Sequence, residues 1–261
     1  TIPGIDDLMS GRLNVSQVRR VDVEDLLGRD KIKLNNSGLN KLLNKKVVLV
    51  SGAGGSIGNE LCKQLIKFKP KTIVCIDISE YALYSLEQSL INEKIKSKLI
   101  YIVADIKNEE RINNIIKRFS PASVFHAAAY KHVPLMEKEN VSEALLNNSL
   151  GTYVLANICQ KLKVKKFVLI STDKAINPTN VMGASKRLAE IFCKKLQNKN
   201  GTEFITVRFG NVLGSSGSVI PLFKEQIENG GPITVTDPRI TRYFMAIPEA
   251  AQLVLQASLI G

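Results

Sequence analysis

Four polar residues in a row, Ser171-Thr172-Asp173-Lys174, follow the short run 166–170, whose composition predicts a strand. Their side chains are therefore expected at the carboxyl end of that strand, which is the edge where open parallel sheets bind ligands. There the adjacent carboxylate and ammonium would offer one substrate both a proton donor and a proton acceptor. The alternative is that the same polar residues form only a loop and a helix cap. We favour acid–base catalysis.

A second group of residues suited to chemistry is a glycine-rich turn between a predicted strand and a predicted helix. The strand is the apolar run 47–50, and the helix follows from apolar residues spaced four apart. Unpaired backbone N–H groups at a helix start favour an anionic pyrophosphate, and glycines let the backbone approach it. The turn residues expected to bind a dinucleotide are Gly52, Gly55, Ser56, Ile57 and Gly58. Glycines that serve only the turn are the alternative, whereas a Walker loop would need a Gly-Lys-Ser/Thr sequence that this turn lacks.

An acidic residue, Asp77, ends the second predicted strand, 72–76, and lies 19 residues after Gly58. An acid at this point accepts hydrogen bonds from the adenosine ribose and would repel the extra phosphate of NADP, so we expect NAD as the cofactor. The alternative is that Asp77 caps the next helix, a role that Ser79 could take instead. We count Ser79 among the expected cofactor-binding residues.

Two further strand ends carry residues that could contact the same cofactor. Asp105 and Ile106 follow the predicted strand 99–103, where they could border the adenine ring. The predicted strand 123–126 is followed by three small residues, Ala127, Ala128 and Ala129. Residues of this size would let a cofactor lie close against the backbone, although they could equally be core alanines.

The elements that must position these residues alternate between strands and helices from residue 46 onward. Strands are predicted at 47–50, 72–76, 99–103, 123–126, 166–170 and 204–209, with a short one at 233–235. Helices are predicted directly after the glycine turn and at 81–90, 109–118, 141–163, 219–228 and 249–259. One more helix is predicted after the turn 178–186, with Leu188, Ile191, Phe192 and Leu196 on one of its faces. Such alternation is typical of a parallel sheet with right-handed crossovers. The expected fold is α/β, a Rossmann-type doubly wound parallel sheet with a small, incomplete C-terminal substrate-binding part.

Three segments follow from this pattern. Residues 1–44 are expected to form a helical linker or arm, and residues 45–212 an NAD-binding domain. Residues 213–261 are expected to begin a substrate-binding region whose final helix returns to the sheet. Because the chain begins with Thr and stops abruptly after a helical pattern, we expect a fragment cut at both ends. No apolar run approaches the roughly 20 residues of a membrane-spanning helix, so the fragment is expected to be soluble.

The composition excludes some classes of protein. Hydrophobic residues make up 44% and charged residues 23% of the 261 residues, as in ordinary globular proteins. The net charge of +12 raises nucleic acid, anionic membranes and anionic substrates as partners. However, the lysines are scattered, Trp is absent, and the aromatic residues are not interleaved with basic ones as a base-stacking surface requires. We interpret the charge as a solvated lysine-rich surface and expect no nucleic-acid partner.

The cysteines do not indicate a metal site. Cys62, Cys75, Cys159 and Cys193 show no C-x-x-C or Cys/His ligand spacing, and the only histidines are His126 and His132. We expect reduced, mostly buried thiols and no bound metal.

Longer strings in the sequence carry a resemblance to a known family. Over residues 46–261 the chain resembles the extended short-chain dehydrogenase/reductase superfamily, through the glycine turn, Asp77, Asp105-Ile106, His126-Ala-Ala-Ala, Asn148, Ser171-Thr172 and Lys186. Within it, the chain is similar to the membrane-anchored bacterial nucleotide-sugar 4,6-dehydratases of the PglF, WbpM and CapD kind. The sequence segments that narrow the resemblance to these dehydratases are His126-Ala-Ala-Ala-Tyr-Lys-His-Val-Pro134, Ser171-Thr-Asp-Lys-Ala175, Arg208-Phe-Gly-Asn-Val212 and Thr241-Arg-Tyr-Phe-Met245. Residues 2–29 also resemble the linker between the membrane part and the catalytic domain of that family.

One position departs from the superfamily pattern. Where its usual catalytic Tyr-x-x-x-Lys would lie, this chain has Met182-Gly-Ala-Ser-Lys186. Methionine cannot give or take a proton, which speaks against a simple tyrosine-dependent reductase or 4-epimerase. The longer dehydratases that the chain resembles carry Met at this place, so the departure supports the resemblance.

The resemblance implies NAD-dependent 4,6-dehydration of UDP-N-acetylglucosamine to UDP-2-acetamido-2,6-dideoxy-α-D-xylo-hexos-4-ulose, for bacterial glycan or polysaccharide biosynthesis. In that reaction Lys174 would remove the sugar C5 proton and Asp173 would protonate the departing C6 hydroxyl. Thr172 would hydrogen-bond the C4 oxygen, and Lys186 would hold the nicotinamide ribose and favour loss of the C4 hydroxyl proton. Asp173 or a water could take that proton. To act as an acid near neutral pH, Asp173 needs a raised pKa, which burial favours and Lys174 opposes.

The resemblance also implies a binding site and a cellular setting. The expected substrate-binding residues are Lys131, His132, Asn148, Asn211 and Arg242. The parent protein would be a homo-oligomer, anchored through its N-terminal part at the cytoplasmic face of the bacterial inner membrane. Two other functions stay open, a UDP-sugar 4-epimerase and a non-catalytic NAD-binding module.

Overall fold

The structure is a computed structural model that describes residues 34–260 apart from 92, 94, 199, 200, 216, 218 and 236. Most of the expected arm, residues 1–33, lies outside this range. Its last part forms helix α2 (Asn36–Leu43), whose start is capped by the Asn35 side chain accepting from the Gly38 N–H. Leu39 and Leu43 of this helix are fully buried in the core of the sheet domain. Residues 36–43 therefore belong to the packed fold rather than to an appended arm.

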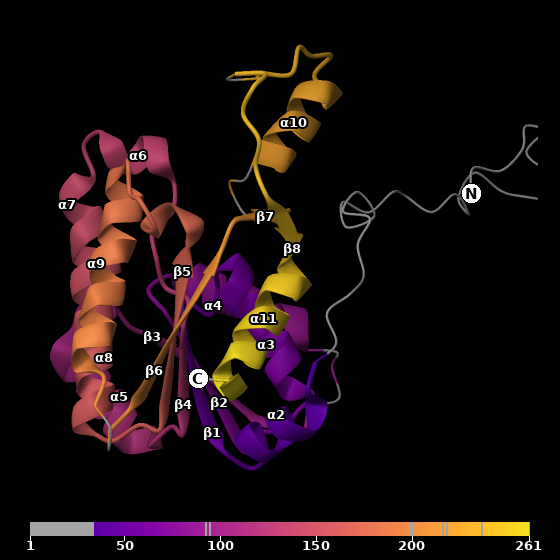
Figure 1. Cartoon of the computed structure of the whole chain (residues 1–261). Coiled ribbons are helices and arrows are strands. Elements are labelled where there is room, and N and C mark those ends of the chain that lie inside the picture. The colour runs from indigo at the N-terminus through magenta and orange to yellow at the C-terminus, as the bar shows by residue number, and fades with distance from the viewer. Residues whose placement is uncertain are drawn as a thin grey trace, which may run out of the picture. The chain divides into compact units, whose positions relative to one another are not determined.

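Six strands form one parallel sheet in the order β3-β2-β1-β4-β5-β6 among the described residues (Figure 1). They are β1 (Val47–Ser51), β2 (Thr72–Asp77), β3 (Lys98–Val103), β4 (Ser123–His126), β5 (Lys166–Thr172) and β6 (Glu203–Phe209). The order reverses next to β1, so β1 and β4 border the point where open α/β sheets bind ligands. The predicted Rossmann-type class is confirmed.

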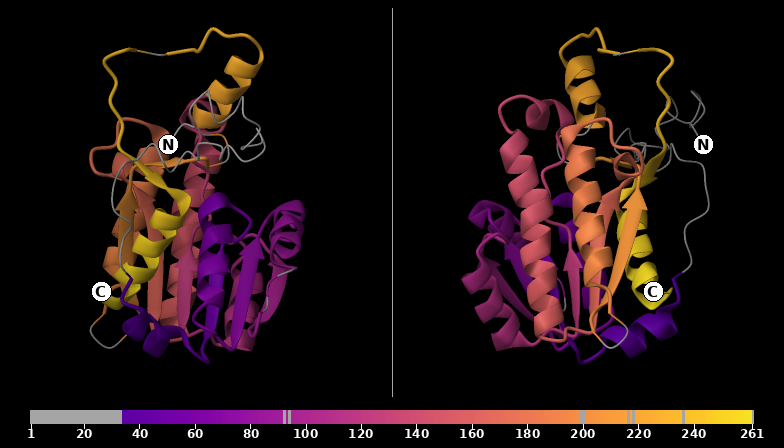
Figure 2. Two further views of the ribbon diagram at one scale, coloured as in Figure 1. Left: turned by 90° about the vertical axis from the view of Figure 1, so that its right-hand side faces the viewer. Right: turned by 60° about the vertical axis from the view of Figure 1, so that its left-hand side comes forward.

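Helices cover both faces of this sheet (Figure 2). Helices α2, α3 (Ser56–Ile66), α4 (Glu80–Leu90) and α11 (Ile247–Ile260) pack on one face, and α5 (Glu109–Phe119), α8 (Thr152–Lys161) and α9 (Val181–Leu196) on the other. Successive strand residues point to opposite faces. Val48 and Val50 thus join the first core, while Leu49 between them joins the second. Because both faces are covered, the strands are continuous apolar runs, which is why their positions can be predicted.

Smaller elements lie beyond the carboxyl ends of the strands. They are α6 (Val133–Glu137), α7 (Val141–Ala144), the 3-10 turn η4 (Asp173–Ala175), β7 (Asn211–Leu213), α10 (Val219–Glu228) and β8 (Phe244–Ala246). β7 follows β6 almost directly and pairs in parallel with β8. The predicted strand at 233–235 is wrong, since residues 233–235 form no strand. The partner of β7 is instead β8, which begins at Phe244.

The single helix predicted over 141–163 is broken in three. A π-helical segment, η3 (Leu145–Gly151), separates α7 from α8. Apolar periodicity cannot reveal this change, because one wider turn alters which residues face inward without altering the composition. Leu145, Leu146 and Leu150 lie on the surface, while Asn147, Asn148 and Ser149 are buried.

Helix α9 shows the same inversion. Leu188 and Ile191, predicted on its packed face, are exposed, whereas Ser185, Lys186 and Glu190 are buried. Polar side chains of η3 hydrogen-bond to α9, and Lys186 of α9 borders a cavity described below.

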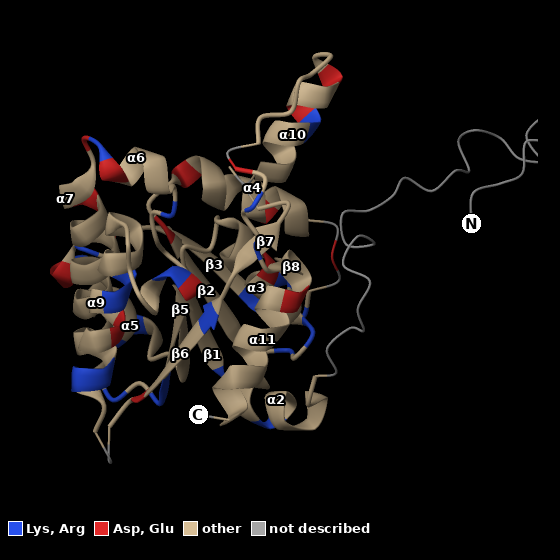
Figure 3. Cartoon of the chain, turned by 45° about the horizontal axis from the view of Figure 1, so that its top comes forward, with Lys and Arg blue, Asp and Glu red and all other residues tan. Residues whose placement is uncertain are grey.

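The charges are spread over several elements, with Asp and Glu between the Lys and Arg residues in the view of Figure 3. No helix within the described part of the chain is long and apolar enough to cross a membrane. The same residues contain no cluster of three or more His, Cys, Asp or Glu that could hold a metal ion. All four cysteines are buried and free, as expected.

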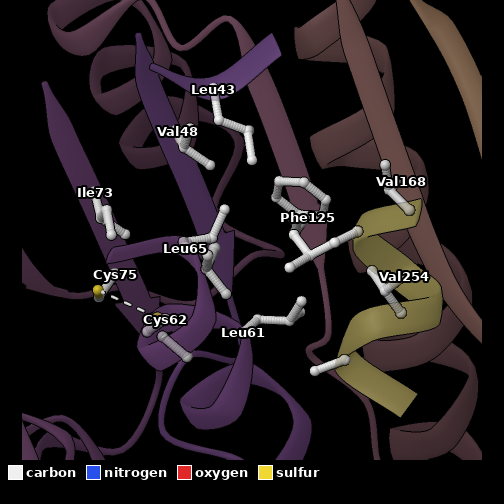
Figure 4. Packing of buried hydrophobic residues seen from close by; sticks show 14 of the residues in the cluster. Leu43, Val48, Leu61, Cys62, Leu65, Ile73, Cys75, Phe125, Val168 and Val254 are labelled. Carbon is white, nitrogen blue, oxygen red and sulfur yellow. Dashed lines mark hydrogen bonds between the residues drawn. The ribbon is translucent and has the colours of Figure 1, made fainter. Parts of the chain in front are cut away.

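The core beneath α3 and α11 is centred on Phe125 (Figure 4). Its ring is fully buried among Val48, Leu65, Val168 and Val254. The buried thiols of Cys62 and Cys75 lie in the same core, with their Sγ atoms 3.7 Å apart.

Replacing Phe125 with Ala should lower the free energy of unfolding by about 3–5 kcal/mol, because the cavity cannot close within a sheet that is covered on both faces. Urea unfolding measures the loss. The matched control is Tyr81→Ala, since Tyr81 is 75% exposed and its removal should change stability by less than about 0.5 kcal/mol. Equal losses in the two variants would contradict this account of the core.

Candidate active site

The glycine turn after β1 is packed too tightly for side chains at two positions. Gly52 has φ +69°, and a Cβ there would lie 2.4 Å from the Ala128 backbone nitrogen. A Cβ on Gly58 would lie 2.0 Å from the Gly52 carbonyl oxygen. Glycine is thus required both for the turn and for the close approach of α3 to β1. A helix start such as that of α3 is a place that can receive an anion.

A third glycine of the turn, Gly54, is more constrained than the motif analysis predicted. A Cβ on Gly54 would lie 2.4 Å from the Ala82 Cβ, whereas one on Gly55 would meet only the Gly52 oxygen at 3.3 Å. The Gly54 N–H also donates to Asp77 Oδ2 at 2.9 Å. The spacing G-x-x-G-x-x-G is therefore only part of the pattern, and Gly54 is the residue that ties the turn to β2 and α4.

Asp77 and Asp105 border a cavity of about 250 Å³, which we call the aspartate cavity. Its other lining includes Gly52, Gly54, Gly55, Ile106 and the three alanines Ala127, Ala128 and Ala129. Ser79 caps α4 by accepting from the Ala82 N–H at 3.2 Å and does not line the cavity. Asp77 is thus not the helix cap, and its carboxylate is available to hydroxyl donors of a nucleoside. The shape and the acids suit an adenosine.

A second cavity, of about 520 Å³, lies beside the first and shares Gly55, Ala127, Ala129 and Tyr130 with it. We call it the lysine cavity. Of the residues predicted from the sequence, it brings together Ser56, Ile57, Gly58, Lys131, His132, Thr172, Lys174, Met182, Lys186 and Asn211. A dinucleotide lying across the turn could place one half in each cavity.

The Thr172-Asp173-Lys174 sequence forms a connected group at the carboxyl end of β5. Asp173 Oδ1 accepts from Thr172 Oγ1 at 2.9 Å and from Lys174 Nζ at 3.0 Å. Lys174 Nζ also donates to Asn211 Oδ1 of β7 at 3.1 Å. Burial acts to raise the pKa of Asp173, but the hydrogen bonds from Lys174 and Thr172 outweigh it and hold the pKa below its ordinary value. The raised pKa that we expected for an acid at this position is therefore absent.

Lys186 and Met182 lie one turn apart on α9 and both face the lysine cavity. The Lys186 ammonium is buried and has no hydrogen-bond partner within the described residues. Burial lowers the pKa of Lys186 to about 8, although Cys193 and Glu190 act in the opposite direction. A buried amine without a partner that borders a cavity is placed to bind a ligand.

The depressed pKa of Lys186 predicts how stability changes with pH. Between about pH 8 and 10.5 the unfolded chain holds more proton at this lysine than the folded one, so rising pH favours the folded state. Replacing Lys186 with Met should remove a gain on the order of 3 kcal/mol over this range. Urea unfolding of the ligand-free protein at a series of pH values tests this, and identical pH slopes in the two proteins would refute it.

A buried ion-pair group that the sequence analysis missed joins α9 to β5 and β6. Glu190 accepts from Ser171 Oγ at 2.6 Å, from Arg208 Nε at 2.7 Å and from Arg187 Nη1 at 3.1 Å. Ser171 precedes Thr172, and Glu190 lies four residues after Lys186, so Glu190 fixes two parts of the cavity relative to each other. The signal available in the sequence was a Glu one turn beyond Lys186, which gains meaning only once β5 and β6 are placed beside α9.

Not all predicted substrate residues face the cavity. Lys131 lines it and donates to Ser215 Oγ at 3.2 Å, and burial lowers the Lys131 pKa. Asn148 is fully buried, lines neither cavity and hydrogen-bonds to protein groups. Arg242 is exposed and donates to the Thr241 carbonyl. Neither residue contacts the cavity in this structure.

The parallel sheet, the glycine turn against a helix start and the two adjoining cavities define a Rossmann-type nucleotide-binding protein. The sequence matches the family described as polysaccharide biosynthesis protein over residues 48–261, and the chain belongs to this family.

Two relatives illustrate the match. The chain is 52% identical over 258 residues to the capsular polysaccharide biosynthesis protein CapD of Staphylococcus aureus, covering 98% of this chain and 43% of the relative. It is 33% identical over 219 residues to a UDP-N-acetylglucosamine 4,6-dehydratase (inverting) of Campylobacter jejuni, covering 82% of this chain and 64% of the relative. The chain thus spans less than half the length of CapD.

Among solved structures, Pen from Bacillus thuringiensis superposes with a TM-score of 0.79 at 36% identity, covering 84% of this chain and 67% of that one. DesIV of Streptomyces venezuelae, a dTDP-glucose 4,6-dehydratase, superposes with a TM-score of 0.72 at 19% identity, covering 80% of this chain and 70% of that one. At that identity the likeness to DesIV concerns the fold alone.

Proposed function

We propose that the chain is the catalytic part of an NAD-dependent nucleotide-sugar 4,6-dehydratase acting on UDP-N-acetylglucosamine. The observation that carries this proposal is the Asp173–Lys174 ion pair at the carboxyl end of β5, because its Lys174 lines the cavity that Lys186 also borders, with Asp173 directly behind it. A protein that only binds a dinucleotide needs the glycine turn but has no use for such a pair. The expected product is UDP-2-acetamido-2,6-dideoxy-α-D-xylo-hexos-4-ulose.

The residues around the glycine turn fit NAD. The turn has no space for side chains at Gly52 and Gly58, the start of α3 suits a pyrophosphate, and Asp77 is placed for the adenosine ribose. Lys186 supplies a buried donor for the second ribose. The Asp77 carboxylate favours NAD over NADP because it would repel a 2′-phosphate. When bound, NAD would accept a hydride from sugar C4 and return it at C6.

The ion pair can supply both an acid and a base without an outside proton. The pair has two forms, one with a Lys174 ammonium and an Asp173 carboxylate, and one with a neutral Lys174 and a protonated Asp173. Transfer of one proton along their 3.0 Å hydrogen bond converts the first form into the second. In the neutral form Lys174 can take the C5 proton and Asp173 can give its proton to the departing C6 hydroxyl. The low pKa of Asp173 then describes the resting pair and does not exclude its use as an acid.

Other side chains have supporting roles in this proposal. Thr172 donates to Asp173 in this structure and would turn its hydroxyl to the sugar C4 oxygen when substrate is bound. The positive charge of Lys186 would favour loss of the C4 hydroxyl proton. That proton would pass to a water, because Asp173 already carries a proton in the neutral form of the pair. Asn211 holds Lys174 through a 3.1 Å hydrogen bond and so orients the base.

Epimerisation of a UDP-sugar at C4 is the second candidate. It is favoured by a 35% identity over 223 residues to a UDP-glucose 4-epimerase of Rickettsia canadensis, covering 81% of this chain and 62% of the relative. Against it stands Met182, which lines the lysine cavity where a tyrosine would be needed as the acid–base group.

The proposal is tested by incubating the protein, after loading with NAD, with UDP-N-acetylglucosamine and analysing the product by NMR. A 4-keto-6-deoxy sugar nucleotide supports dehydration, and UDP-N-acetylgalactosamine would show epimerisation instead. An inert wild type whose activity is restored by Met182→Tyr would refute the dehydratase assignment.

The setting of the whole protein also stays a prediction. We expect membrane attachment through parts of the parent protein outside this chain, at the cytoplasmic face of the bacterial inner membrane, and a homo-oligomer. Polysaccharide biosynthesis, the process named for CapD, is the proposed pathway class.

A further inference from the structure

His126, the last residue of β4, is fully buried and has no part in the chemistry proposed above. Its Nδ1 lies 2.7 Å from Ser51 Oγ, at the end of β1, and its Nε2 lies 2.8 Å from Thr152 Oγ1, at the start of α8. The ring therefore joins the strand that leads into the glycine turn to the helix that follows the π-helical segment η3.

The hydrogen bonds around Thr152 assign the tautomer of this ring. Thr152 Oγ1 donates its single proton to the Asn148 carbonyl at 2.6 Å, so toward His126 it can only accept. The Nε2 atom of His126 must then carry the hydrogen, and its bare Nδ1 accepts from Ser51 Oγ. Burial, and secondly the charge of Lys186, lower the pKa of His126 to about 3, which keeps the ring neutral at working pH.

From Thr152 the hydrogen bonds continue toward the catalytic side of α9. The Asn148 amide accepts from the Tyr130 N–H at 2.8 Å and donates to the Tyr130 carbonyl at 2.9 Å. The same amide donates to Ser185 Oγ at 3.0 Å, and Ser149 Oγ donates to the Ser185 carbonyl at 2.8 Å. Ser185 immediately precedes Lys186. A chain of buried hydrogen bonds thus connects the residue before Gly52 to the residue before Lys186.

The hydrogen-bonded polar side chains between Ser51 and Ser185 are unusual for the interior of a protein. Ser51, His126, Asn148, Thr152 and Ser185 are all fully buried, and burying polar side chains costs free energy unless every partner is satisfied. Apolar residues of similar size would fill the space at lower cost. The group also borders a π-helical segment, a feature that occurs frequently at functional sites.

We propose that His126 is a positioning residue, whose neutral ring with the hydrogen on Nε2 holds η3 in place and so sets Lys186 relative to a dinucleotide on the glycine turn. This inference rests on the proposed function for its effect on turnover. The placement of the ring itself does not depend on the reaction.

The kinetic test compares Thr152→Val with Thr152→Ser in the NAD-loaded protein. Val keeps the volume but removes the acceptor for His126 and the donor to Asn148, whereas Ser keeps the hydroxyl. We expect kcat for UDP-N-acetylglucosamine to fall about 10- to 100-fold in Thr152→Val, with KM and NAD affinity changed less than about threefold, because a small misplacement costs turnover more than binding. Thr152→Ser should retain most of kcat. A kcat of Thr152→Val equal to that of wild type would overturn the proposal.

The second test does not need turnover. The chain has two histidines, so a spectrum of protein labelled with ¹⁵N only in histidine shows two imidazoles, and His132→Asn assigns them. We expect a His126 ring with the hydrogen on Nε2 and no titration between about pH 5 and 9, unlike an ordinary histidine. A hydrogen on Nδ1, or a titrating ring, would overturn the proposal. A wild type that is inert on the sugar would instead refute the proposed function, and the spectrum would still decide the state of the ring.

Discussion

Replacing Lys174 with Ala is expected to lower kcat for 4,6-dehydration by roughly 10²- to 10⁴-fold, the usual contribution of a general base or acid. Asp173→Asn should cost a similar factor, because asparagine keeps the shape and still accepts from Thr172 and Lys174 but carries no exchangeable acid proton. Both side chains are partly exposed, so neither change should lower the melting temperature appreciably. NAD binding should also persist, since neither residue touches the glycine turn.

Both variants should block exchange of the sugar C5 proton with deuterated solvent. Without Lys174 the C5 proton has no base, so no exchange is expected. In Asp173→Asn the Lys174 ammonium has no carboxylate to take its proton and cannot become a base, so no exchange is expected there either. The control is Lys166→Ala, which breaks a 2.9 Å ion pair with Glu203 at the opposite end of β5 and should leave kcat unchanged. C5 exchange at the wild-type rate in Lys174→Ala would contradict the assignment of the base.

Replacing Gly58 with Ala is expected to weaken NAD binding by roughly tenfold to a hundredfold or more. The new Cβ would lie 2.0 Å from the Gly52 carbonyl oxygen, and a backbone atom cannot move aside as a flexible side chain can. Overpacking of this kind costs about 1–3 kcal/mol, and each 1.4 kcal/mol changes the dissociation constant by about tenfold. Isothermal titration with NAD measures the loss.

The matched control for Gly58 is Gly201→Ala. A Cβ on Gly201 would meet only the Asn198 Cβ at 3.5 Å and the Asn198 carbonyl oxygen at 3.9 Å, both ordinary contacts. NAD affinity should therefore be unchanged in Gly201→Ala. If Gly58→Ala binds NAD as tightly as the control does, the close approach of α3 to β1 is not what the cofactor site needs.

The strands and the glycine turn are predictable because their information is local. Strands covered on both faces need unbroken apolar runs, and β4 spans the predicted residues 123–126. The prediction failed where polar groups replace apolar ones in the interior. Asn148, predicted to bind substrate, and Glu190, which the sequence did not single out, are both buried, where other buried side chains hydrogen-bond to them. That satisfaction comes from segments distant in sequence, which periodicity cannot detect.

The sequence by itself thus determined the class of fold, the turn that can take a dinucleotide and the residues able to do acid–base chemistry. Only the tertiary structure decided how these residues pair, which pKa values they have and which of them line the cavities. It made Asp173 and Lys174 one ion pair, left Lys186 buried with a pKa of about 8, and kept Asn148 and Arg242 out of the cavities. The reason is physical, since pKa values and cavities depend on distances between β1, β4, β5 and α9, which the chain brings together only when it folds.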